Sequence, residues 1–168
     1  MGLPVLRTRR LILRPWTKAD AAALHELWTT PEVRRYLWDD VVIERDTVEQ
    51  VIASHLATSH EHGIGYWALH GSNETEPMTG FCGFRFIEAS PEIELLYGLR
   101  GEHWGKGLAT EASLAALEHL WRSTGFQRVY ARTDAPNAKS VQVMRRLSMT
   151  HESTSANLIT YVLPRPLG

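Results

Sequence analysis

A glycine-bearing loop joins an apolar strand to a helical segment in the middle of the chain. The apolar run 92–99 is followed by Gly101, Gly105 and Gly107, and a helical pattern begins at Leu108. The first amides of a helix have no hydrogen-bond partner inside the helix and carry the positive end of its dipole. A loop with glycines at this point can direct several N–H groups at one anion, and a diphosphate is the natural ligand.

Two common phosphate-binding motifs do not match this loop. A P-loop needs a Ser or Thr after its lysine, whereas Gly107 follows Lys106, and the spacing from Gly101 to Lys106 also differs. The dinucleotide fingerprint needs a third glycine, but Leu108-Ala109-Thr110 follows Gly107. The loop is therefore assigned to neither class.

The other reactive side chains give weaker indications. Cys82 lies in an apolar segment without a basic neighbour, and such cysteines usually behave as small buried hydrophobes rather than as acyl-carrying nucleophiles. His55, His60 and His62 are not spaced as a zinc site and lack a companion set of cysteines or carboxylates. We expect no bound metal, and we expect these histidines to lie at the surface.

The flanking sequence predicts the elements that must hold the loop. Strands are predicted where β-branched and aromatic residues gather between turn signals, and helices where apolar residues recur every three or four positions. The predicted strands are 10–14, 66–70, 78–87, 92–99 and 129–133, with a hairpin-like tail at 158–163. The predicted helices are 17–30, 46–63, 108–125 and 141–147. The pattern is α+β, with an antiparallel meander from 66 to 99, in one domain spanning residues 1–168.

Composition restricts the classes of partner. The chain has 168 residues, 43% of them hydrophobic, and a formal net charge of -1, so no overall basic field favours nucleic acid. The longest apolar runs are far shorter than the roughly 20 residues of a membrane span. One cysteine and no apolar leader at the N-terminus favour a cytoplasmic protein without disulfides.

The loop and its flanks resemble the GNAT superfamily of acetyl-CoA-dependent N-acetyltransferases, and most closely its RimJ/RimL-type branch. The phosphate loop of that family has the pattern Gln/Arg-x-x-Gly-x-Gly/Ala, which residues 102–107 follow after their first position. The likeness covers nearly the whole chain. The segments that carry it are TRRLILRPW (8–16), TPEV (30–33), WGKGLATEA (104–112), NAKS (137–140) and LSM (147–149).

Three residues depart from the family pattern. Glu102 stands where the family has Gln or Arg, so its side chain must point away from the diphosphate. Ser148 replaces a glycine at a position where glycine is favoured for ending a helix. Met144 occupies the place of a tyrosine that acts as general acid in many members, so that role must move to another group or vanish.

The resemblance implies a fold and a cofactor site. The fold is a mixed central sheet of about six to seven strands with helices on both faces, and strands four and five splay apart to admit the pantetheine arm of acetyl-CoA. Backbone amides of the loop and the hydroxyl of Thr110 would hold the diphosphate, and the backbone around 97–99 would pair with pantetheine. The residues expected to bind the cofactor are Tyr97, Leu99, His103, Trp104, Gly105, Lys106, Gly107, Leu108, Thr110 and Asn137. Two plainer interpretations stay open: the glycines only make a turn, and Asn137 only caps a helix.

The resemblance also implies catalytic roles. Ser140 would lie near the thioester sulfur and protonate the departing thiolate; otherwise it is a solvent-facing serine. Glu94 is the candidate general base, because an attacking amine must lose a proton and a carboxylate on the sheet is the usual acceptor. Alternation along the strand places Glu94 on the face opposite Tyr97. The other interpretation of Glu94 is an edge glutamate that faces water.

The expected activity is direct acetyl transfer from acetyl-CoA to a primary amine, without an acyl-enzyme and without a metal. The first choice of acceptor is a protein or peptide N-terminal amine, whose pKa near 7.7 to 8.0 leaves more neutral amine at pH 7 than that of lysine, about 10.4. The alternatives are a small-molecule amine, a CoA-binding or sensory domain with little catalysis, and a Cys82 acyl carrier. A homodimer is left open, and neither nucleic acid nor a membrane is an expected partner.

Overall fold

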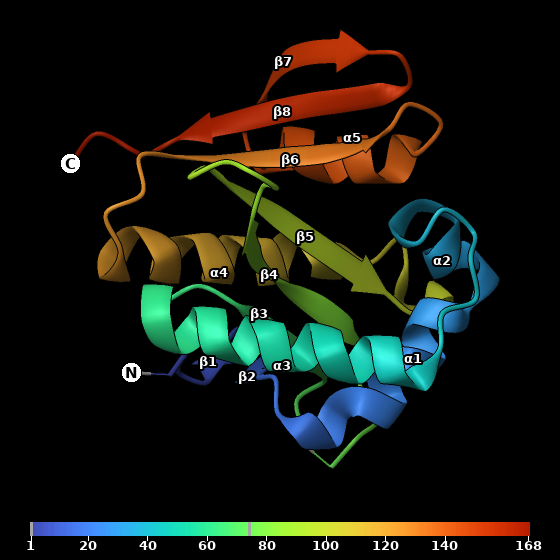
Figure 1. The fold of residues 1–168 in the computed structure, drawn as a ribbon. Helices are drawn as coiled ribbons and strands as arrows, with labels where there is room; N and C mark the ends of the chain where they lie inside the picture. The colour runs from blue at the N-terminus through green and yellow to red at the C-terminus, as the bar shows by residue number, and fades with distance from the viewer. Residues whose placement is uncertain (1, 74) are drawn as a thin grey trace.

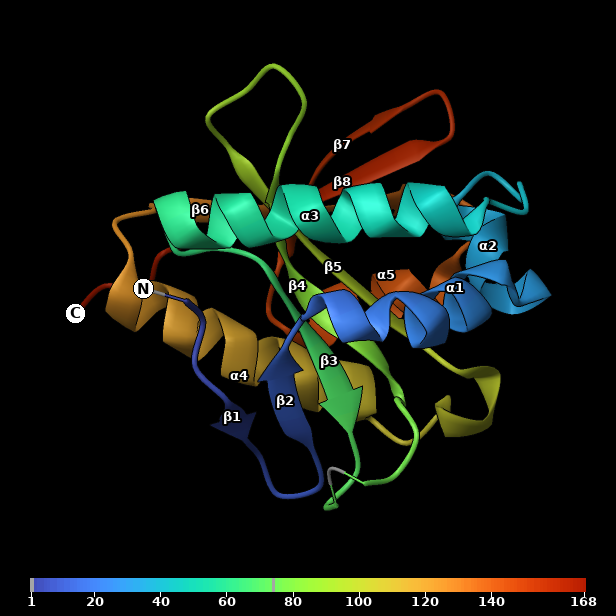
Figure 2. The same cartoon turned by 60° about the horizontal axis from the view of Figure 1, so that its bottom comes forward.

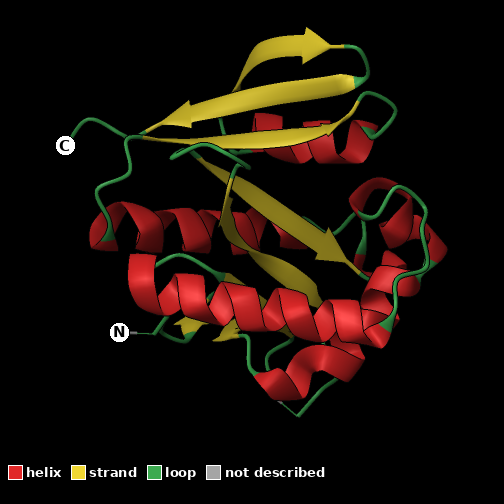
Figure 3. Ribbon diagram, in the orientation of Figure 1, coloured by secondary structure: helices red, strands yellow, loops and turns green. Residues whose placement is uncertain are grey.

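The strands form one mixed sheet with helices on both faces in the computed structural model, which describes residues 2–73 and 75–168 (Figures 1 and 3). Within these residues the sheet has eight strands in the order β1-β2-β3-β4-β5-β6-β8-β7. The strands are β1 (Leu6–Arg7), β2 (Ile12–Pro15), β3 (Tyr66–His70), β4 (Gly80–Phe86), β5 (Ile93–Leu99), β6 (Arg128–Asp134), β7 (Thr150–Ser155) and β8 (Leu158–Pro164). The helices are α1 (Ala21–Thr29), α2 (Pro31–Leu37), α3 (Arg45–His62), α4 (Leu108–Ser123) and α5 (Ala138–Arg146), with short 3-10 helices at Lys18–Asp20 and Gly101–His103. The predicted α+β class is confirmed.

The sheet has more strands than the six to seven that the sequence predicts. The strand β1 has only two residues, and all six residues of the edge strand β7 are exposed. Neither strand has the apolar alternation that marks a half-buried strand in sequence. The strand β2 also begins later than the predicted 10–14, because a turn occupies residues 8–11, where the Thr8 N–H donates to the Leu11 carbonyl at 2.9 Å.

The helix prediction differs from the structure at α2 and α5. Thr30-Pro31 ends α1 as predicted, but Pro31 also begins α2 at once, since proline is well suited to the first position of a helix. The helix α5 begins three residues before the predicted start, directly after Asn137. The longer helices α3 and α4 lie where they are predicted, and α3 ends at Gly63 with a left-handed φ of 71°. Within the described part of the chain, no helix combines the length and the apolar character that crossing a membrane requires.

The expected splay lies between β5 and β6, the fourth and fifth strands of the prediction. Along the antiparallel meander, β4 and β5 pair through seven positions, from Phe86 with Ile93 to Gly80 with Leu99. In contrast, β5 and β6 run parallel and, among the described residues, pair only through Glu94 and Tyr130. The two strands therefore diverge toward their carboxyl ends, as Figure 1 shows.

Alternate residues of the sheet face two separate cores. Trp67, Cys82 and Leu95 belong to the core under α4 and α5, whereas Tyr66 and Phe81 belong to the core under α1, α2 and α3. The helix α3 passes in front of the sheet and α4 behind it, and Figure 2 shows the same two layers from another side. Adjacent residues of β5 are thus presented to different helical layers.

His55 does not lie at the surface as the sequence analysis expects. It is half-buried on α3, and its ring meets the rings of Tyr66 and Trp16 edge-on at centroid distances of 4.6 and 6.0 Å. Burial, followed by the charge of Arg85, lowers the pKa of His55 to about 4. Trp16 and Tyr66 come together with His55 only in the fold, so the histidine spacing does not reveal them.

Candidate functional site

The glycine-bearing loop leads from the end of β5 through the 3-10 helix Gly101–His103 to the N-terminus of α4. Gly105 and Gly107 have φ angles of 75° and 77°, in the left-handed region that favours glycine. The first backbone bond of α4 runs from the Glu111 N–H to the Gly107 carbonyl at 3.0 Å. The three amides before it, those of Leu108, Ala109 and Thr110, have no acceptor within the helix and are available to an anion.

The Thr110 hydroxyl is the second indication of a ligand at this loop. Its Oγ1 is buried and has no hydrogen-bond partner among the residues that the structure describes. A buried hydroxyl without a partner costs about 1–3 kcal/mol, so such groups usually serve a ligand or a water molecule. The position of Thr110 in the first turn of α4 fits a phosphate oxygen.

Trp104 and Lys139 lie across the mouth of the splay. The Trp104 Nε1 donates to the carbonyl of Leu99 at 2.9 Å, which holds the indole against the end of β5. The Lys139 Nζ lies 4.2 Å from the centroid of the Trp104 ring, a cation–π contact between α5 and the loop. Nothing in the sequence pattern indicated this contact.

Glu102, His103 and Lys106 lie on the rim of the loop. The Glu102 side chain is 73% exposed, and its Oε1 lies 3.6 Å from the Nε2 of His103. The departure from the family pattern at Glu102 therefore does not bury a negative charge in the loop. Lys106 is exposed, so its ammonium group adds a positive charge at the surface of the same loop.

The backbone of β5 presents unpaired groups to the splay. The Arg100 N–H donates to Thr79 on the β4 side at 2.9 Å. Because successive residues of a strand direct their amides to opposite sides, Leu99 and Tyr97 direct theirs toward β6. The pairing of β5 with β6 does not extend to these positions. The backbone groups of Tyr97 are therefore open to an extended ligand, whereas the Leu99 carbonyl accepts the hydrogen bond from Trp104 Nε1.

Tyr97 and Ser140 meet on the α4–α5 side of the sheet. The Tyr97 hydroxyl lies 2.9 Å from the Ser140 Oγ and donates to the Ser140 carbonyl, also at 2.9 Å. Burial, partly offset by the hydrogen bond with Ser140, raises the pKa of Tyr97 above its ordinary value. Ser140 is therefore half-buried and hydrogen-bonded rather than simply solvent-facing.

Asn137 caps α5. Its Oδ1 accepts the Ser140 N–H at 3.3 Å, and its Nδ2 donates to the Thr133 Oγ1 at 3.1 Å. The side chain thus joins β6 to the first turn of α5 and fixes the position of Ser140. One N–H of Nδ2 and one lone pair of Oδ1 remain for a ligand.

Glu94 lies on the opposite face of β5, between two arginines. Its side chain is 4% exposed; Oε1 is 2.8 Å from Arg85 Nε, and Oε2 is 2.6 Å from Arg132 Nε. Burial acts to raise the pKa of Glu94, but the hydrogen bonds and charges of Arg132 and Arg85 outweigh it and hold that pKa below its ordinary value. The carboxylate does not face water, and it stays ionised at neutral pH.

The two arginines are the part of this site that the sequence analysis missed. Arg85 is directly opposite Glu94 in the β4–β5 register, and Arg132 lies two residues beyond Tyr130, the β6 partner of Glu94. Only the strand register reveals this grouping.

Met144 and Cys82 are packed in the core and have no groups that could exchange protons with a substrate at neutral pH. The Met144 side chain is 1% exposed in the core under α4 and α5. Cys82 is fully buried, with its Sγ 3.7 Å from the Ser113 Oγ, and burial raises the pKa of its thiol to about 12. A buried, protonated thiol is a poor nucleophile, which argues against the acyl-carrier alternative.

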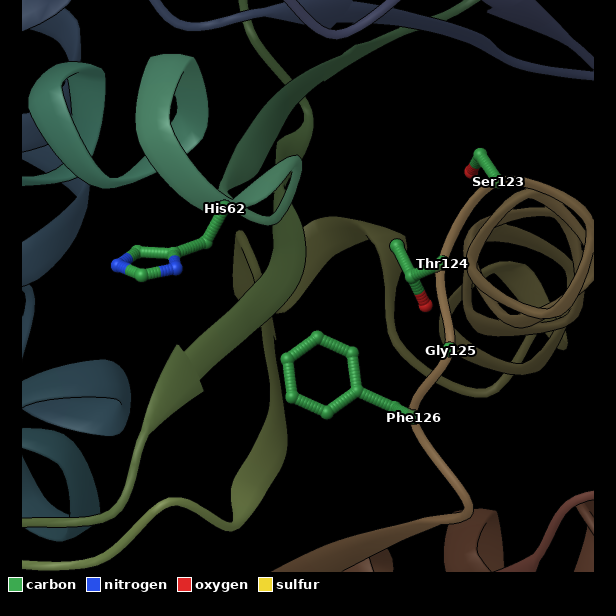
Figure 4. A pocket seen from close by; sticks show the side chains of 5 residues that line it. All are labelled: His62, Ser123, Thr124, Gly125 and Phe126. Atoms are coloured by element: carbon green, nitrogen blue, oxygen red, sulfur yellow. The ribbon is translucent and has the colours of Figure 1, made fainter.

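A cavity of about 340 Å³ lies where α3 and α4 end (Figure 4). Its lining residues are His62, Ser123, Thr124, Gly125 and Phe126. The Thr124 hydroxyl already donates to the Leu120 carbonyl at 2.8 Å, and the Ser123 hydroxyl donates to the His119 carbonyl. Residues 2–73 and 75–168 contain no group of three or more His, Cys, Asp or Glu placed to hold a metal ion.

Comparisons with known proteins assign the family. The family described as the acetyltransferase (GNAT) domain matches residues 10–150. An uncharacterized N-acetyltransferase, p20, of Bacillus licheniformis is 30% identical over 155 residues, which cover 89% of this chain and 84% of that protein. The spermidine N(1)-acetyltransferase of Escherichia coli K12 is 21% identical over 140 residues, covering 83% of this chain and 73% of the relative.

Solved structures have the same fold. An acetyltransferase from Agrobacterium tumefaciens C58 superposes with a TM-score of 0.84 at 25% identity, covering 97% of this chain and 95% of its own. RimL, the ribosomal L7/L12 α-N-protein acetyltransferase, was solved in complex with coenzyme A. It superposes with a TM-score of 0.79 at 20% identity, covering 96% of this chain and 98% of its own. The predicted GNAT fold is thereby confirmed, with eight strands in the described sheet in place of six to seven.

Proposed function

Because the chain belongs to the GNAT acetyltransferases, we propose that it moves the acetyl group of acetyl-CoA directly to a primary amine, and that this amine is the N-terminal amine of a protein or peptide. The observation that carries the cofactor assignment is the buried, unpartnered Thr110 hydroxyl in the first turn of α4. Bound acetyl-CoA would supply the activated acetyl thioester. The amides of 103–108 and Thr110 would hold its diphosphate, and the Tyr97 backbone would hold its pantetheine arm.

The two faces of β5 divide the proton transfers. Glu94 faces the α1–α3 layer and would accept the proton of the amine. Because Arg85 and Arg132 occupy both of its oxygens, we propose that the proton reaches Glu94 through a water molecule. Ser140 faces the other layer and would protonate the departing thiolate, held in place by Tyr97 and by the cap at Asn137. A backbone amide of β5 would polarise the thioester carbonyl.

A protein N-terminus is the first choice because RimL, an α-N-protein acetyltransferase of ribosomal L7/L12, has the same fold. An α-amine is neutral more often than a lysine at pH 7, which suits a base whose low pKa makes it weak. A small amine is the second candidate, and the relative named as a spermidine acetyltransferase favours it. The third is a CoA-binding domain with little catalysis, which the methionine at position 144 favours.

A thiol-release assay separates these candidates. Short peptides with free and blocked N-termini are offered with acetyl-CoA, beside polyamines and amino sugars. We expect turnover with free N-termini only. Equal turnover of a blocked peptide that carries a lysine, or turnover of small amines alone, overturns the N-terminal assignment and leaves the acetyltransferase. Binding of CoA without turnover of any amine favours the sensory alternative.

A further inference from the structure

The turn between β1 and β2 lies against the first turn of α4. In this turn the Thr8 Oγ1 accepts the Leu11 N–H at 3.0 Å and donates to the Glu111 Oε2 at 2.9 Å. The Arg10 N–H also donates to Glu111 Oε2, at 3.3 Å. Figure 2 shows β1 and β2 beside α4. Glu111 therefore fastens the N-terminal segment to the helix that begins at the phosphate loop.

Arg10 connects this fastening to the loop itself. Its Nε lies 3.1 Å from Glu111 Oε1, and its Nη1 donates to the carbonyl of Lys106 at 2.8 Å. The fork of the guanidinium thus spans two groups, one on α4 and one in the loop. A lysine has a single nitrogen and cannot bridge both with this geometry.

The contact with Lys106 determines where one loop amide points. The peptide bond is planar and trans, so its carbonyl and its N–H point in opposite directions. Arg10 holds the carbonyl of the Lys106–Gly107 peptide on its own side, which directs the Gly107 N–H to the other side of the loop. Gly107 has a left-handed φ of 77°. Glycine adopts this conformation without strain, but it adopts right-handed conformations about as readily. An external contact is needed to select it.

Arg10 also pairs with the negative charge of Glu111. Glu111 places a carboxylate in the first turn of α4, beside the amides that would receive the diphosphate. A carboxylate there would repel an anionic ligand unless a cation were paired with it. The Arg10 guanidinium is that cation.

We propose that Arg10 is a positioning residue for cofactor binding: held by Glu111, which Thr8 fixes in turn, it orients the Lys106–Gly107 peptide so that the loop amides are ready for the diphosphate of acetyl-CoA. This inference rests on the proposed function. In this proposal Arg10 acts through its contact with the Lys106 carbonyl and not on the acetyl group or the amine.

The test is calorimetric titration of CoA into the wild type, Arg10→Ala, Arg10→Lys and the control Arg9→Ala, whose side chain is exposed on the same turn. We expect about tenfold weaker CoA binding for both Arg10 variants, because the loss of hydrogen bonds to a charged group is large, and unchanged binding for Arg9→Ala. In turnover assays the KM for acetyl-CoA should rise while the KM for the amine stays constant. Melting temperatures measured in parallel establish that each variant is folded.

The titration is repeated with 3′-dephospho-CoA. If Arg10 orients the diphosphate cradle, its replacement weakens the binding of both ligands by the same factor. A loss confined to intact CoA would overturn the positioning role in favour of direct contact with the 3′-phosphate. CoA affinity within twofold of the wild type in folded Arg10→Ala or Arg10→Lys overturns the inference as well. If the wild type itself does not bind CoA, the proposed function fails instead.

Discussion

The hydroxyl of Tyr97 lies 2.9 Å from both the Oγ and the carbonyl oxygen of Ser140. A phenol has one proton, so when Tyr97 donates to the carbonyl, the Ser140 hydroxyl must donate to Tyr97. The strand β5 thereby fixes the rotamer of the proposed general acid on α5. Met144, one turn further along the same helix, is buried and has no proton to give.

Ser140→Ala should lower kcat by about 100-fold or more, the usual cost of losing an acid or base, with little change in CoA affinity. Tyr97→Phe should lower kcat less, by about tenfold, because Ser140 keeps its hydroxyl and loses only its orientation. Stopped-flow or steady-state kinetics with the best amine measures both. Wild-type kcat in Ser140→Ala would mean that water or the amine itself delivers the proton.

Replacement of Glu94 tests the proposed base. Because Arg132 and Arg85 hold the pKa of Glu94 below its ordinary value, it stays ionised throughout neutral pH, and the wild-type rate should show no loss from this group between pH 6 and 9. Glu94→Gln should lower kcat by about 100-fold across that whole interval. The matched control is Glu92→Gln, which removes a carboxylate two residues away that is 30% exposed and pairs with Arg128. If both variants keep normal rates, Glu94 is a structural ion-pair partner and not the base.

Gly107→Ala should weaken CoA binding severely. The residue has a φ of 77°, where a side chain costs about 1–2 kcal/mol, and the loop can relieve this strain only by turning its amides. Gly125→Ala is the control, because a Cβ there meets no atom within 4 Å and its φ is not left-handed. Titration with CoA measures the difference. Equal affinity of the two variants would show that the left-handed glycine is not needed for the site.

The sequence predicts the order of the strands and helices around the loop and which face of a strand each residue occupies. It does not predict which side chains from different elements pair. The period-2 alternation of β5 separates Glu94 from Tyr97, and the structure places them on opposite faces. The pairing of Glu94 with Arg85 depends on the β4–β5 register, which no local pattern contains. The contact of Arg10 with Lys106 joins residues 96 positions apart. Long-range hydrogen bonds of this kind are determined by the packing of the sheet and helices together.

The titration of His55 should make folding stability depend on pH in mild acid. Its pKa is about 4 in the folded protein, lowered by burial and then by Arg85, against an ordinary value of 6.5 in the unfolded chain. Between these values the unfolded chain binds the proton more readily, so stability is complete above about pH 6.5 and falls as the pH drops toward 4, by at most about 1.4 kcal/mol per pH unit.

His55→Phe keeps an aromatic ring against Tyr66 and removes the titrating group. Melting temperatures from pH 7.5 to 4.5 should therefore fall less steeply for this variant than for the wild type. His119, whose pKa burial also lowers, remains in both proteins and cancels in the comparison. Parallel curves for the two proteins would contradict the assignment to His55.

Ser148→Gly should stabilise the protein. The end of α5 is a Schellman motif, in which the Met149 N–H donates to the Met144 carbonyl at 3.1 Å and the Ser148 N–H to the Arg145 carbonyl at 3.0 Å. This geometry requires a left-handed residue, and Ser148 has a φ of 63°. Glycine adopts that conformation without the steric cost of about 1–2 kcal/mol that other residues incur. The Ser148 side chain is exposed, and among the described residues it makes no hydrogen bond that glycine would remove.

We expect Ser148→Gly to raise the free energy of unfolding by about 1 kcal/mol, which corresponds to a rise of about 2–4 °C in Tm for a chain of this length. Ser148→Ala serves as the control, because it removes the hydroxyl and keeps the Cβ, and it should show no gain. A melting temperature for Ser148→Gly at or below that of the wild type would mean that the greater freedom of glycine in the unfolded chain cancels the relief of strain.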